Sequence, residues 1–492
     1  MAMTKSAKVR SQLKHPIVDA DGHWLELYPV FLDYIAEIGG AKTADAYTEV
    51  LRNAPGYGGN NLITAETRWK QRNRRQGWWG LPTNTKYRTA CMVPGLCYDT
   101  LDDWGIDVML LYPTLGFSLM GIIKDADLRQ AVVRAYNYMA ADMFKPYGDR
   151  MIASAVISLE TPSEALELLE HAQSLGHKLL VMNGASQRPI EADTDIPVNK
   201  RRYYFDSFGI DSPYNYDPVW QKLVDMKAAL TVHTGTQGWP DRSSPTSFVF
   251  NHMGHFAQSH HITARGLFMG GVTQRFPKLN VGFLEGGVGW ACTLYGDIFG
   301  HWKKRNRPFM QKHCDPMLLD RKEVKRLMQK YVGDNKRWTG KIDEILANNL
   351  ETPEPNVSQE ALSKRDRKSD DFDRVQIKSA RDIRKLYAGN FYFGCEADDP
   401  MTVMAFNEQA GLKLKAMMGS DIGHFDVPDA TEVIEEAWEM VEHGLITEEN
   451  FREFTLTNAV ELHAGMNPDF FKGTVIEKLV PAELKRARAR KF

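Results

Sequence analysis

Short apolar runs recur along the chain, and most of them are followed by a stretch of residues with helical spacing. Eight runs have the length and the apolar content that buried strands require. They are residues 17–21, 107–112, 151–159, 178–182, 229–233, 280–284, 390–395 and 416–420. Strands that alternate with helices predict parallel βαβ units in an α/β fold. Eight such units predict a (β/α)8 barrel of the TIM type.

Residues that begin and end helices support this alternation. Thr161 and Pro162 predict the start of a helix that ends at Gly176. Asp217 and Thr447 predict the starts of two further helices. These helices lie between or after predicted strands, as a barrel requires.

Three connecting segments are too long for ordinary loops, so we predict that they are insertions. They are residues 24–104, 183–216 and 300–388. Each follows a predicted strand, and loops that follow strands lie on the active-site face of a barrel. We therefore expect one barrel domain over residues 1–492, with three insertions on that face.

Composition and charge narrow the function. The chain has 492 residues, of which 43% are hydrophobic and 25% charged, and its formal net charge is −2, so nothing indicates a nucleic-acid partner. No apolar run reaches the roughly 20 residues of a membrane helix, and the first residues lack the apolar core of a signal peptide. The five cysteines form no CxxC pair, which fits a reducing compartment. We expect a cytoplasmic protein without a membrane partner.

Acidic residues and histidines stand at the ends of several predicted strands. In the first strand, Asp21 and His23 are two positions apart, so their side chains point to the same face. His233, Glu285 and Asp421 end three other strands. The carboxyl ends of parallel barrel strands share one rim, so the five side chains should converge there. A lone histidine in this position is more often a core residue, but the set of five favours a metal site.

These motifs resemble the amidohydrolase superfamily, in particular the amidohydrolase-related (amidohydrolase 2) branch with aminocarboxymuconate semialdehyde decarboxylase and the resorcylate-type decarboxylases. The resemblance rests on residues 18–23, 112–114, 231–235, 271–279, 285–287 and 419–424. It implies a barrel that binds one divalent metal ion, Zn, Mn or Fe. Carried over by position, the metal ligands are Asp21, His23, His233 and Asp421.

Two positions depart from the family pattern. Asp21 stands where the family usually has a histidine, or a glutamate in some decarboxylases, and Glu285 stands where it usually has a histidine. Each change gives a carboxylate in place of an imidazole, which favours harder ions such as Mn²⁺ or Fe²⁺ over Zn²⁺. The fourth strand ends without a lysine, so we do not expect a lysine-bridged pair of metals.

The sequence does not exclude a second metal ion that is bridged to the first by carboxylates. Its candidate ligands are Glu26 and Glu285. The alternative for Glu26, which the sequence favours, is a solvated residue that opens a helix.

Substrate binding is predicted for Arg74, Arg75 and Trp78 in the first insertion and for His424 after the last strand. An arginine can bind a carboxylate through two hydrogen bonds, and an indole can cover an apolar body. His424 resembles a histidine that the family places near the site. The alternative for the first three residues is a solvated basic helix followed by core tryptophans.

The leading hypothesis is a metal-dependent hydrolase or decarboxylase (a lyase) that acts on a small carboxylate-bearing substrate. Asp421 would act as general base and acid, with Glu285 and His233 as further catalytic residues. A second hypothesis is a carboxylate-rich Fe or Mn oxygenase of the same superfamily that works with a partner subunit. A third is a non-catalytic metal-binding subunit of such a complex.

The third insertion predicts an oligomer interface. Its first part has apolar residues at amphipathic-helix spacing among many charges, and such a stripe must pack against another surface. We expect a homo-oligomer, with a hetero-oligomer that contains a related subunit as the alternative. A cap that folds over the chain's own site is the competing interpretation.

Overall fold

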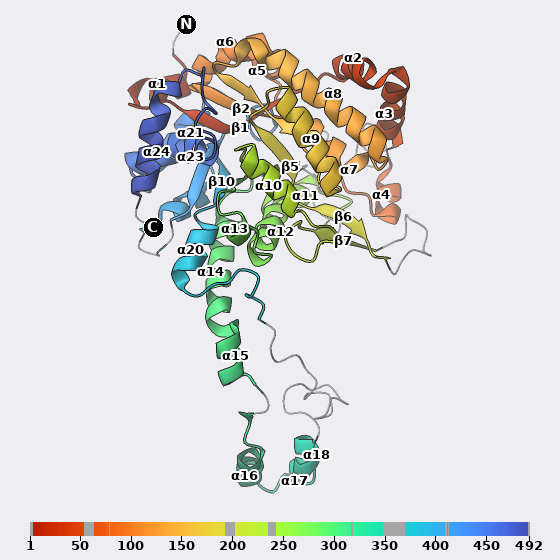
Figure 1. The fold of residues 1–492 in the computed structure, drawn as a ribbon, viewed down its shortest axis with the longest axis vertical. Coiled ribbons are helices and arrows are strands. Elements are labelled where there is room, and N and C mark those ends of the chain that lie inside the picture. Colours follow the sequence, from red (N-terminus) through yellow and green to blue (C-terminus); the bar gives the residue numbers. More distant parts are fainter. Residues whose placement is uncertain are drawn as a thin grey trace. The chain divides into compact units, whose positions relative to one another are not determined.

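The computed structural model describes residues 3–53, 63–77, 79–191, 202–234, 243–315, 318–347, 370–408, 411 and 413–490. The chain divides into two compact units (Figure 1). Unit 1 comprises Met1–Tyr295 and Ser379–Phe492, and unit 2 comprises Gly296–Lys378. Among the described residues, no helix is both long and apolar enough to cross a membrane.

Parallel strands form the centre of unit 1, and helices lie around them (Figure 1). One sheet has the strand order β1-β2-β3 and the other has the order β11-β10-β9-β8-β5-β4, and all neighbouring strands in both are parallel. Their bounds are β1 (Val18–Trp24), β2 (Val108–Pro113), β3 (Met151–Ala153), β4 (Ala155–Val156), β5 (Leu180–Asn183), β8 (Leu230–His233), β9 (Val281–Phe283), β10 (Phe391–Glu396) and β11 (Lys415–Gly419). The fold is therefore mixed α/β with parallel sheets.

Backbone hydrogen bonds join the two sheets at two places. Ser154 separates β3 from β4, and its N–H donates to the Leu111 carbonyl at 2.9 Å. At the other edge, the N–H of Asp421, which follows β11, donates to the Asp21 carbonyl of β1 at 2.9 Å. The ends of β1 and β11 are thus held side by side.

Each of the eight predicted strand runs overlaps a strand of the structure. The run 151–159 is divided at Ser154 into β3 and β4. Strands β1, β2 and β11 are buried along their whole length, as expected for strands that are covered on both faces.

Three helices of unit 1 begin at the predicted positions, directly after Thr161, at Asp217 and directly after Thr447. Thr161 Oγ1 accepts the N–H of Glu164 at 3.2 Å at the start of α9, and Gly176 beyond its end has φ +82°. The helices are α1 (Lys5–Gln12), α2 (Tyr28–Gly39), α3 (Ala41–Asn53), α4 (Ala65–Gln71), α5 (Thr85–Met92), α6 (Pro94–Trp104), α7 (Gly116–Ile122), α8 (Ala126–Phe144), α9 (Pro162–Ser174), α10 (Asp217–Asp225), α11 (Phe248–His252), α12 (His255–Met269), α13 (Val272–Arg275), α20 (Ala380–Tyr387), α21 (Val433–Glu442), α22 (Glu448–Arg452), α23 (Asn458–Ala464) and α24 (Val480–Ala489). Helix α14 (Gly289–Arg305) begins in unit 1 and ends in unit 2.

The segment 183–216 contains a β-hairpin that the sequence did not predict. Strands β6 (Ser186–Pro189) and β7 (Tyr203–Asp206) pair in antiparallel fashion. The buried positions of β6 are Ser186 and Arg188, so this strand lacks the alternation of apolar residues that identifies a half-buried strand.

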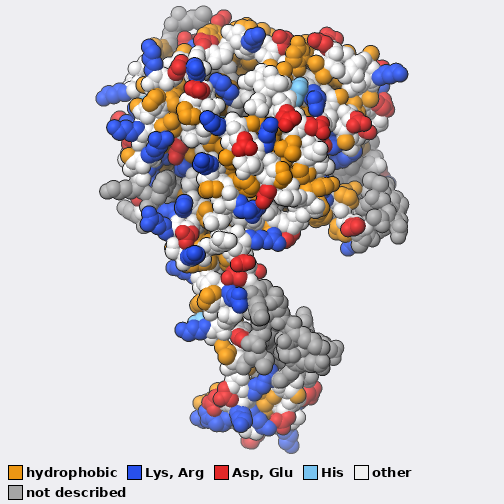
Figure 2. Space-filling view, in the orientation of Figure 1, with side chains coloured by type: hydrophobic (Ala, Val, Ile, Leu, Met, Phe, Trp, Pro, Cys, Tyr) orange, Lys and Arg blue, Asp and Glu red, His pale blue; other side chains and the backbone are white. Residues whose placement is uncertain are grey.

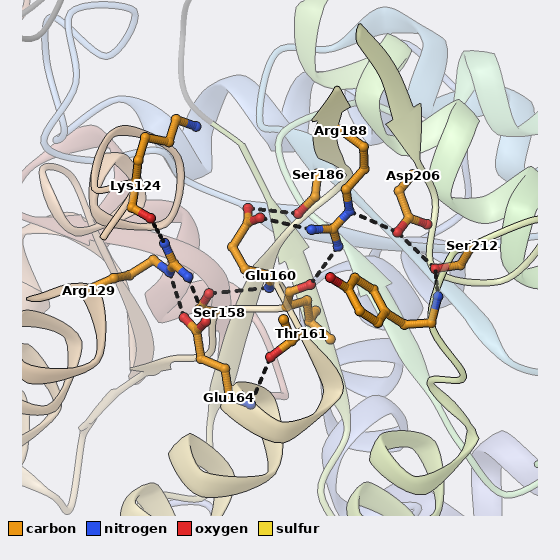
Figure 3. Close-up of polar contacts among 12 residues, drawn as sticks. Lys124, Arg129, Ser158, Glu160, Thr161, Glu164, Ser186, Arg188, Asp206 and Ser212 are labelled. Atoms are coloured by element: carbon orange, nitrogen blue, oxygen red, sulfur yellow. Dashed lines mark hydrogen bonds and ion pairs between the residues drawn. The ribbon is translucent and has the colours of Figure 1, made fainter. Parts of the chain in front are cut away.

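Two buried arginines fix the elements beyond β4 (Figure 3). Arg188 of β6 donates to Glu160 Oε2 at 3.0 Å and to Asp206 Oδ2 at 3.2 Å. Arg129 of α8 donates to both carboxylate oxygens of Glu164 of α9, at 2.6 and 2.7 Å. These ion pairs hold the hairpin to the end of β4 and α8 to α9.

Unit 2 contains four short helices among its described residues, besides the end of α14. They are α15 (Arg307–His313), α16 (Arg321–Tyr331), α17 (Lys336–Thr339) and α18 (Ile342–Ala347). Asp320 caps α16 by accepting the N–H groups of Lys322 and Glu323, each at 3.0 Å. Several large apolar side chains are exposed, among them Leu318, Tyr331 and Trp338.

Candidate metal centre

The first strand carries a bulge where it reaches the centre. The pairing register of β1 with β2 shifts between Asp19 and Gly22. A Cβ on Gly22 would lie 2.3 Å from the Met109 side chain and 2.8 Å from Asp19 Oδ2, so a larger residue would require these side chains to shift. The Asp19 carboxylate accepts two hydrogen bonds from Ser420, one from its N–H at 2.9 Å and one from its hydroxyl at 2.6 Å. Asp19 therefore fastens β1 to the end of β11.

Five side chains from the ends of β1, β8, β9 and β11 meet. His23 Nε2 lies 3.5 Å from Asp21 Oδ1 and 3.3 Å from Asp421 Oδ1. His233 Nε2 lies 2.8 Å from Glu285 Oε2 and 4.0 Å from Asp21 Oδ2. All five residues are buried, with Glu285 the most exposed at 7%.

Glu285 and Asp421 have backbone conformations that are unusual for residues other than glycine. Their φ angles are +58° and +50°, in the left-handed region. Such conformations cost on the order of 1 kcal/mol or more and concentrate at functional sites. Both residues come just after a strand, where the chain leaves the sheet with the carboxylate against a histidine.

Hydrogen bonds fix which nitrogen of each histidine is free. His23 Nδ1 lies 3.1 Å from the Pro113 carbonyl oxygen, and His233 Nδ1 lies 2.9 Å from the Thr234 carbonyl oxygen. A carbonyl oxygen only accepts, so Nδ1 carries the hydrogen and Nε2 of the neutral ring has a lone pair. Burial lowers the pKa of both histidines well below 6.5, so both rings are neutral at pH 7.

The carboxyl groups repel one another. Burial, together with neighbouring carboxylates, raises the pKa of Asp21, Glu285 and Asp421 well above the usual range. At the end of β10, burial raises the pKa of Glu396 to about 8, with a further contribution from Asp426. A bound cation would offset this repulsion.

Several buried atoms have no hydrogen-bond partner within the described structure. They are Asp21 Oδ1, His23 Nε2, His233 Nε2, Glu285 Oε2, Asp421 Oδ1 and Asp421 Oδ2. Imidazole lone pairs and carboxylate oxygens are the donors of Mn²⁺, Fe²⁺ and Zn²⁺ sites. The residues therefore fit a divalent metal ion.

The ligand atoms form overlapping groups, in each of which all atoms lie within 4.8 Å of one another. One group is Asp21, His23, His233 and Glu285, and a second is His23, Glu285, Asp421 and His424. A third, less buried group is His252, Glu285 and Asp426.

Glu26 lies outside these groups. It is 5% exposed, so the expectation of a solvated residue is wrong. Its carboxylate accepts the backbone N–H groups of Leu115 at 2.8 Å and Gly116 at 3.0 Å, and that of Thr114 at 3.3 Å. Glu26 thus caps the turn before α7, and burial raises its pKa to about 7.

The predicted substrate residues have different positions. His424 Nδ1 lies 2.6 Å from Asp421 Oδ1, and its ring stacks on His23 with 4.1 Å between centroids. Arg75 donates its backbone N–H to the Ser244 carbonyl at 2.9 Å, and burial lowers the pKa of Arg74. Trp78 lies outside the described residues. The substrate roles of these residues stay predictions.

Phe117 and Asp426 join the centre without having been predicted. Phe117 stacks on His233 at 4.1 Å between centroids with an interplanar angle of 12°. No pattern distinguishes it from a core phenylalanine. Asp426 lies five positions after Asp421 in the sequence DIGHFD, so its closeness to another acidic residue was the available signal.

A family model described as Amidohydrolase matches residues 18–311 of the chain. The match covers more than half of the sequence and includes the first four of the five strand-end residues. The protein belongs to the amidohydrolase family and is a metal-dependent enzyme of that class. No curated protein matches the sequence.

Several solved structures are similar to the chain at low identity. An amidohydrolase from Mycobacterium avium subsp. paratuberculosis K-10 is 16% identical, with a TM-score of 0.49 over 92% of this chain and 99% of that chain. A 2,6-dihydroxybenzoate decarboxylase from Rhizobium is 14% identical, with a TM-score of 0.46 over 91% and 98%. A dihydroxybenzoic acid decarboxylase from Polaromonas sp. JS666, with bound manganese, is 12% identical, with a TM-score of 0.48 over 91% and 97%. Family membership rests on the match over residues 18–311.

Proposed function

We propose that the protein is a metal-dependent hydrolase or decarboxylase that acts on a small carboxylate-bearing molecule. The metal ligands would be Asp21, His23, His233 and Asp421. The observation that carries this proposal is that lone pairs of two neutral, buried imidazoles face buried carboxylate oxygens at 2.8 to 4.0 Å. Such an arrangement is repulsive unless a cation or a proton lies between the two groups.

The scaffold that we propose is one closed (β/α)8 barrel domain, with insertions at 24–104, 183–216 and 300–388. The parallel strand order and the backbone hydrogen bonds that join the two sheets at both edges support it. In a closed barrel, the ends of β1, β8, β9 and β11 open on the same rim, where the enzymes of this architecture have their active sites.

The chemistry that a divalent metal supplies when bound is polarisation of a substrate oxygen or a lower pKa of a bound water. Asp421 is the proposed general base and acid, because neither of its carboxylate oxygens has a hydrogen-bond partner among the described residues. One oxygen could bind the metal while the other moves the proton. Glu285, held against His233, would orient that histidine or accept a proton. Arg74 and Arg75 would bind the substrate carboxylate, and Trp78 would cover its apolar part.

The metal site is tested by His233→Ala and Asp421→Ala. Each variant should retain far less bound metal than the parent after loading with Mn²⁺ and desalting, measured by elemental analysis. His443→Ala is the control, because His443 is exposed at the end of α21. Full metal content in both site variants would refute the proposed centre. Changing Arg74 and Arg75 should weaken substrate binding but leave metal content intact.

The abundance of carboxylates favours a second candidate, an Fe or Mn oxygenase that works with a partner subunit. Besides Asp21, Glu285 and Asp421, the groups near the centre include Glu396 and Asp426, whose charges affect one another. Oxygen-rich ligand sets suit Mn²⁺ and Fe²⁺. Oxygen consumption by the Fe²⁺-loaded protein would favour this candidate. A third outcome is a metal-loaded protein that shows neither hydrolase or decarboxylase activity nor oxygen consumption, alone or with a partner. Such a protein would be a non-catalytic metal-binding subunit.

Unit 2 is the proposed interface with a second copy of the chain, and a related subunit is the alternative partner. Tyr331 is 73% exposed, Leu318 63% and Trp338 49%, which supports burial of this surface in an assembly. Deletion of residues 308–373 should lower the mass of the folded protein in solution to that of the monomer. A shortened protein with the parent's oligomeric state would refute the interface.

The proposed partner is a small molecule rather than a nucleic acid, and the proposed compartment is the cytoplasm. On the face drawn in Figure 2, acidic and basic side chains are mixed, without a surface of one sign over unit 1. All five cysteines are free, which suits a reducing compartment.

A further inference from the structure

Glu26 is a buried carboxylate that belongs to none of the described ligand groups. Its Oε2 accepts the N–H groups of Leu115 at 2.8 Å and Thr114 at 3.3 Å, and its Oε1 accepts that of Gly116 at 3.0 Å. Hydrogen bonds from N–H groups to an ionised carboxylate are stronger than those between neutral groups. One side chain thus holds three consecutive residues of the turn between β2 and α7.

The turn is tightly packed around this carboxylate. A Cβ on Gly116 would lie 3.2 Å from Glu26 Oε1, 2.6 Å from the Pro113 Cβ and 2.9 Å from the Tyr136 ring. The lack of a side chain at Gly116 therefore lets the backbone come close to Glu26. The position of the turn depends on this close approach.

The residue before the turn fixes the orientation of His23. His23 Nδ1 donates to the Pro113 carbonyl oxygen at 3.1 Å, which leaves Nε2 for the centre. Pro113 directly precedes Thr114, the first residue whose N–H the Glu26 carboxylate accepts. A shift of the turn would therefore move the group that orients the His23 ring.

Two further histidines contact the same segment. Thr114 Oγ1 lies 3.1 Å from His424 Nε2. Phe117, directly after Gly116, stacks on His233 with 4.1 Å between ring centroids and 12° between ring planes. The segment 113–117 thus contacts three histidines, and all three belong to the ligand groups of the centre.

We propose that Glu26 is a positioning residue of the metal centre: its carboxylate holds residues 113–117, which orient the three histidines for metal binding. The proposal rests on the proposed metal-dependent function and goes beyond it, because Glu26 acts without binding the ion. The competing explanation is that Glu26 only stabilises the fold. In that case its loss would lower stability but leave the environment of the metal unchanged.

The variant Glu26→Gln tests the proposal in the full-length protein. Glutamine has nearly the same shape, but its amide NH2 cannot accept a hydrogen bond, so part of the contact to the turn is lost. The probes are Mn²⁺ and Co²⁺, each added alone. We expect the variant to bind as much Mn²⁺ at saturation as the parent, with a Kd raised about tenfold. The visible absorption spectrum of bound Co²⁺, which reports the geometry of its ligands, should shift. The parent's Kd and spectrum in this variant would overturn the proposal.

Glu164→Gln is the control for lost stability, because Glu164 is also buried but pairs with Arg129 instead of the turn. It should unfold more easily than the parent and keep the parent's Kd and Co²⁺ spectrum. Equal changes of Kd and spectrum in both variants would overturn the proposal, since destabilisation alone would then explain them. A parent protein that binds neither ion would refute the proposed function itself, and the role of Glu26 with it.

Gly116→Ala disturbs the same contact from the side of the turn and keeps the charge of Glu26. It should therefore raise the Kd for Mn²⁺ and shift the Co²⁺ spectrum as Glu26→Gln does. Gly121→Ala on the same helix is the matched control, because a Cβ on Gly121 would have none of the described groups within 4 Å. If Glu26→Gln does not fold, as judged by circular dichroism, this pair decides. Equal Kd values and spectra of the two alanine variants would overturn the proposal.

Discussion

Two buried clusters of charged side chains in unit 1 differ in how their charges are compensated. Beyond β4, Arg129 and Glu164 have side chains only 6% and 4% exposed and bind each other through two hydrogen bonds. At the strand ends, Asp21, Glu285 and Asp421 are equally buried, yet their histidine neighbours present lone pairs instead of hydrogens. Burial alone therefore does not identify a functional site. The distinguishing feature is the lack of a compensating hydrogen-bond donor among the described residues.

The ion pair beyond β4 should be structural, and its loss should have the largest effect. Glu164→Gln leaves the Arg129 guanidinium buried without a counter-charge, so the free energy of unfolding should fall by roughly 3–5 kcal/mol, with or without metal. Denaturant titration measures this change.

The matched control is Glu167→Gln on the same helix. Glu167 is paired with Arg134 at 3.5 Å, and its side chain is 53% exposed. Its substitution should change the free energy of unfolding by less than about 0.5 kcal/mol. Equal effects of the two substitutions would mean that the Arg129 pair is not structural.

His463 is a useful contrast because it is a buried histidine whose pKa is shifted by burial alone. Neither ring nitrogen has a hydrogen-bond partner within the described structure, and the ring stacks on Phe470 at 4.3 Å. Burial lowers its pKa from 6.5 to about 3. The unfolded chain therefore binds a proton below pH 6.5 that the folded chain does not, and stability falls as the pH drops from 6.5 towards 3.

His463→Leu should remove this loss of stability. Between pH 7 and pH 4.5, the stability of the variant should rise relative to the parent by roughly 3 kcal/mol. Denaturant titrations of both proteins at the two pH values measure the difference. If the difference in the free energy of unfolding between the variant and the parent is the same at both pH values, His463 does not titrate as its burial predicts.

Apart from the Glu167→Gln control, Asp421→Asn should have the smallest effect on the free energy of unfolding, and the sign of that effect should depend on whether metal is bound. In chelator-treated protein at pH 7 it removes a repelling carboxyl group, so the free energy of unfolding should rise by about 1–2 kcal/mol. Asparagine tolerates the left-handed conformation of this position, so the backbone should be unaffected. With excess Mn²⁺ the parent should become the more stable protein, because it binds the ion more tightly.

Thermal unfolding of the variant and the parent, with and without Mn²⁺, measures the sign of the stability difference under both conditions. A variant that is less stable than the parent in both conditions would place Asp421 with Glu164, among the residues whose partners the protein itself provides.

The apolar runs explain why the strands of the two parallel sheets could be predicted from the sequence. The nine described strands of the two parallel sheets overlap the eight apolar runs, because strands that are buried on both faces are mostly apolar. The hairpin of β6 and β7 was not predictable in this way, since its buried arginine is compensated by Glu160 and Asp206, which are distant in sequence or on the partner strand.

The sequence by itself determined which residues reach the centre: Asp21, His23, His233, Glu285 and Asp421 each stand at a strand end, and strand ends meet in a parallel fold. Only the tertiary structure decided what each of them faces. The bulge in β1 turns Asp19 to Ser420, and backbone N–H groups of residues 114–116 occupy Glu26. Thr114, which is remote in the sequence, places its Oγ1 3.1 Å from Nε2 of His424. His233 bonds to the neighbouring residue Thr234, but the partners of His23, Asp19 and Glu26 come from remote segments. Which lone pairs stay free therefore depends largely on contacts that the local sequence does not contain.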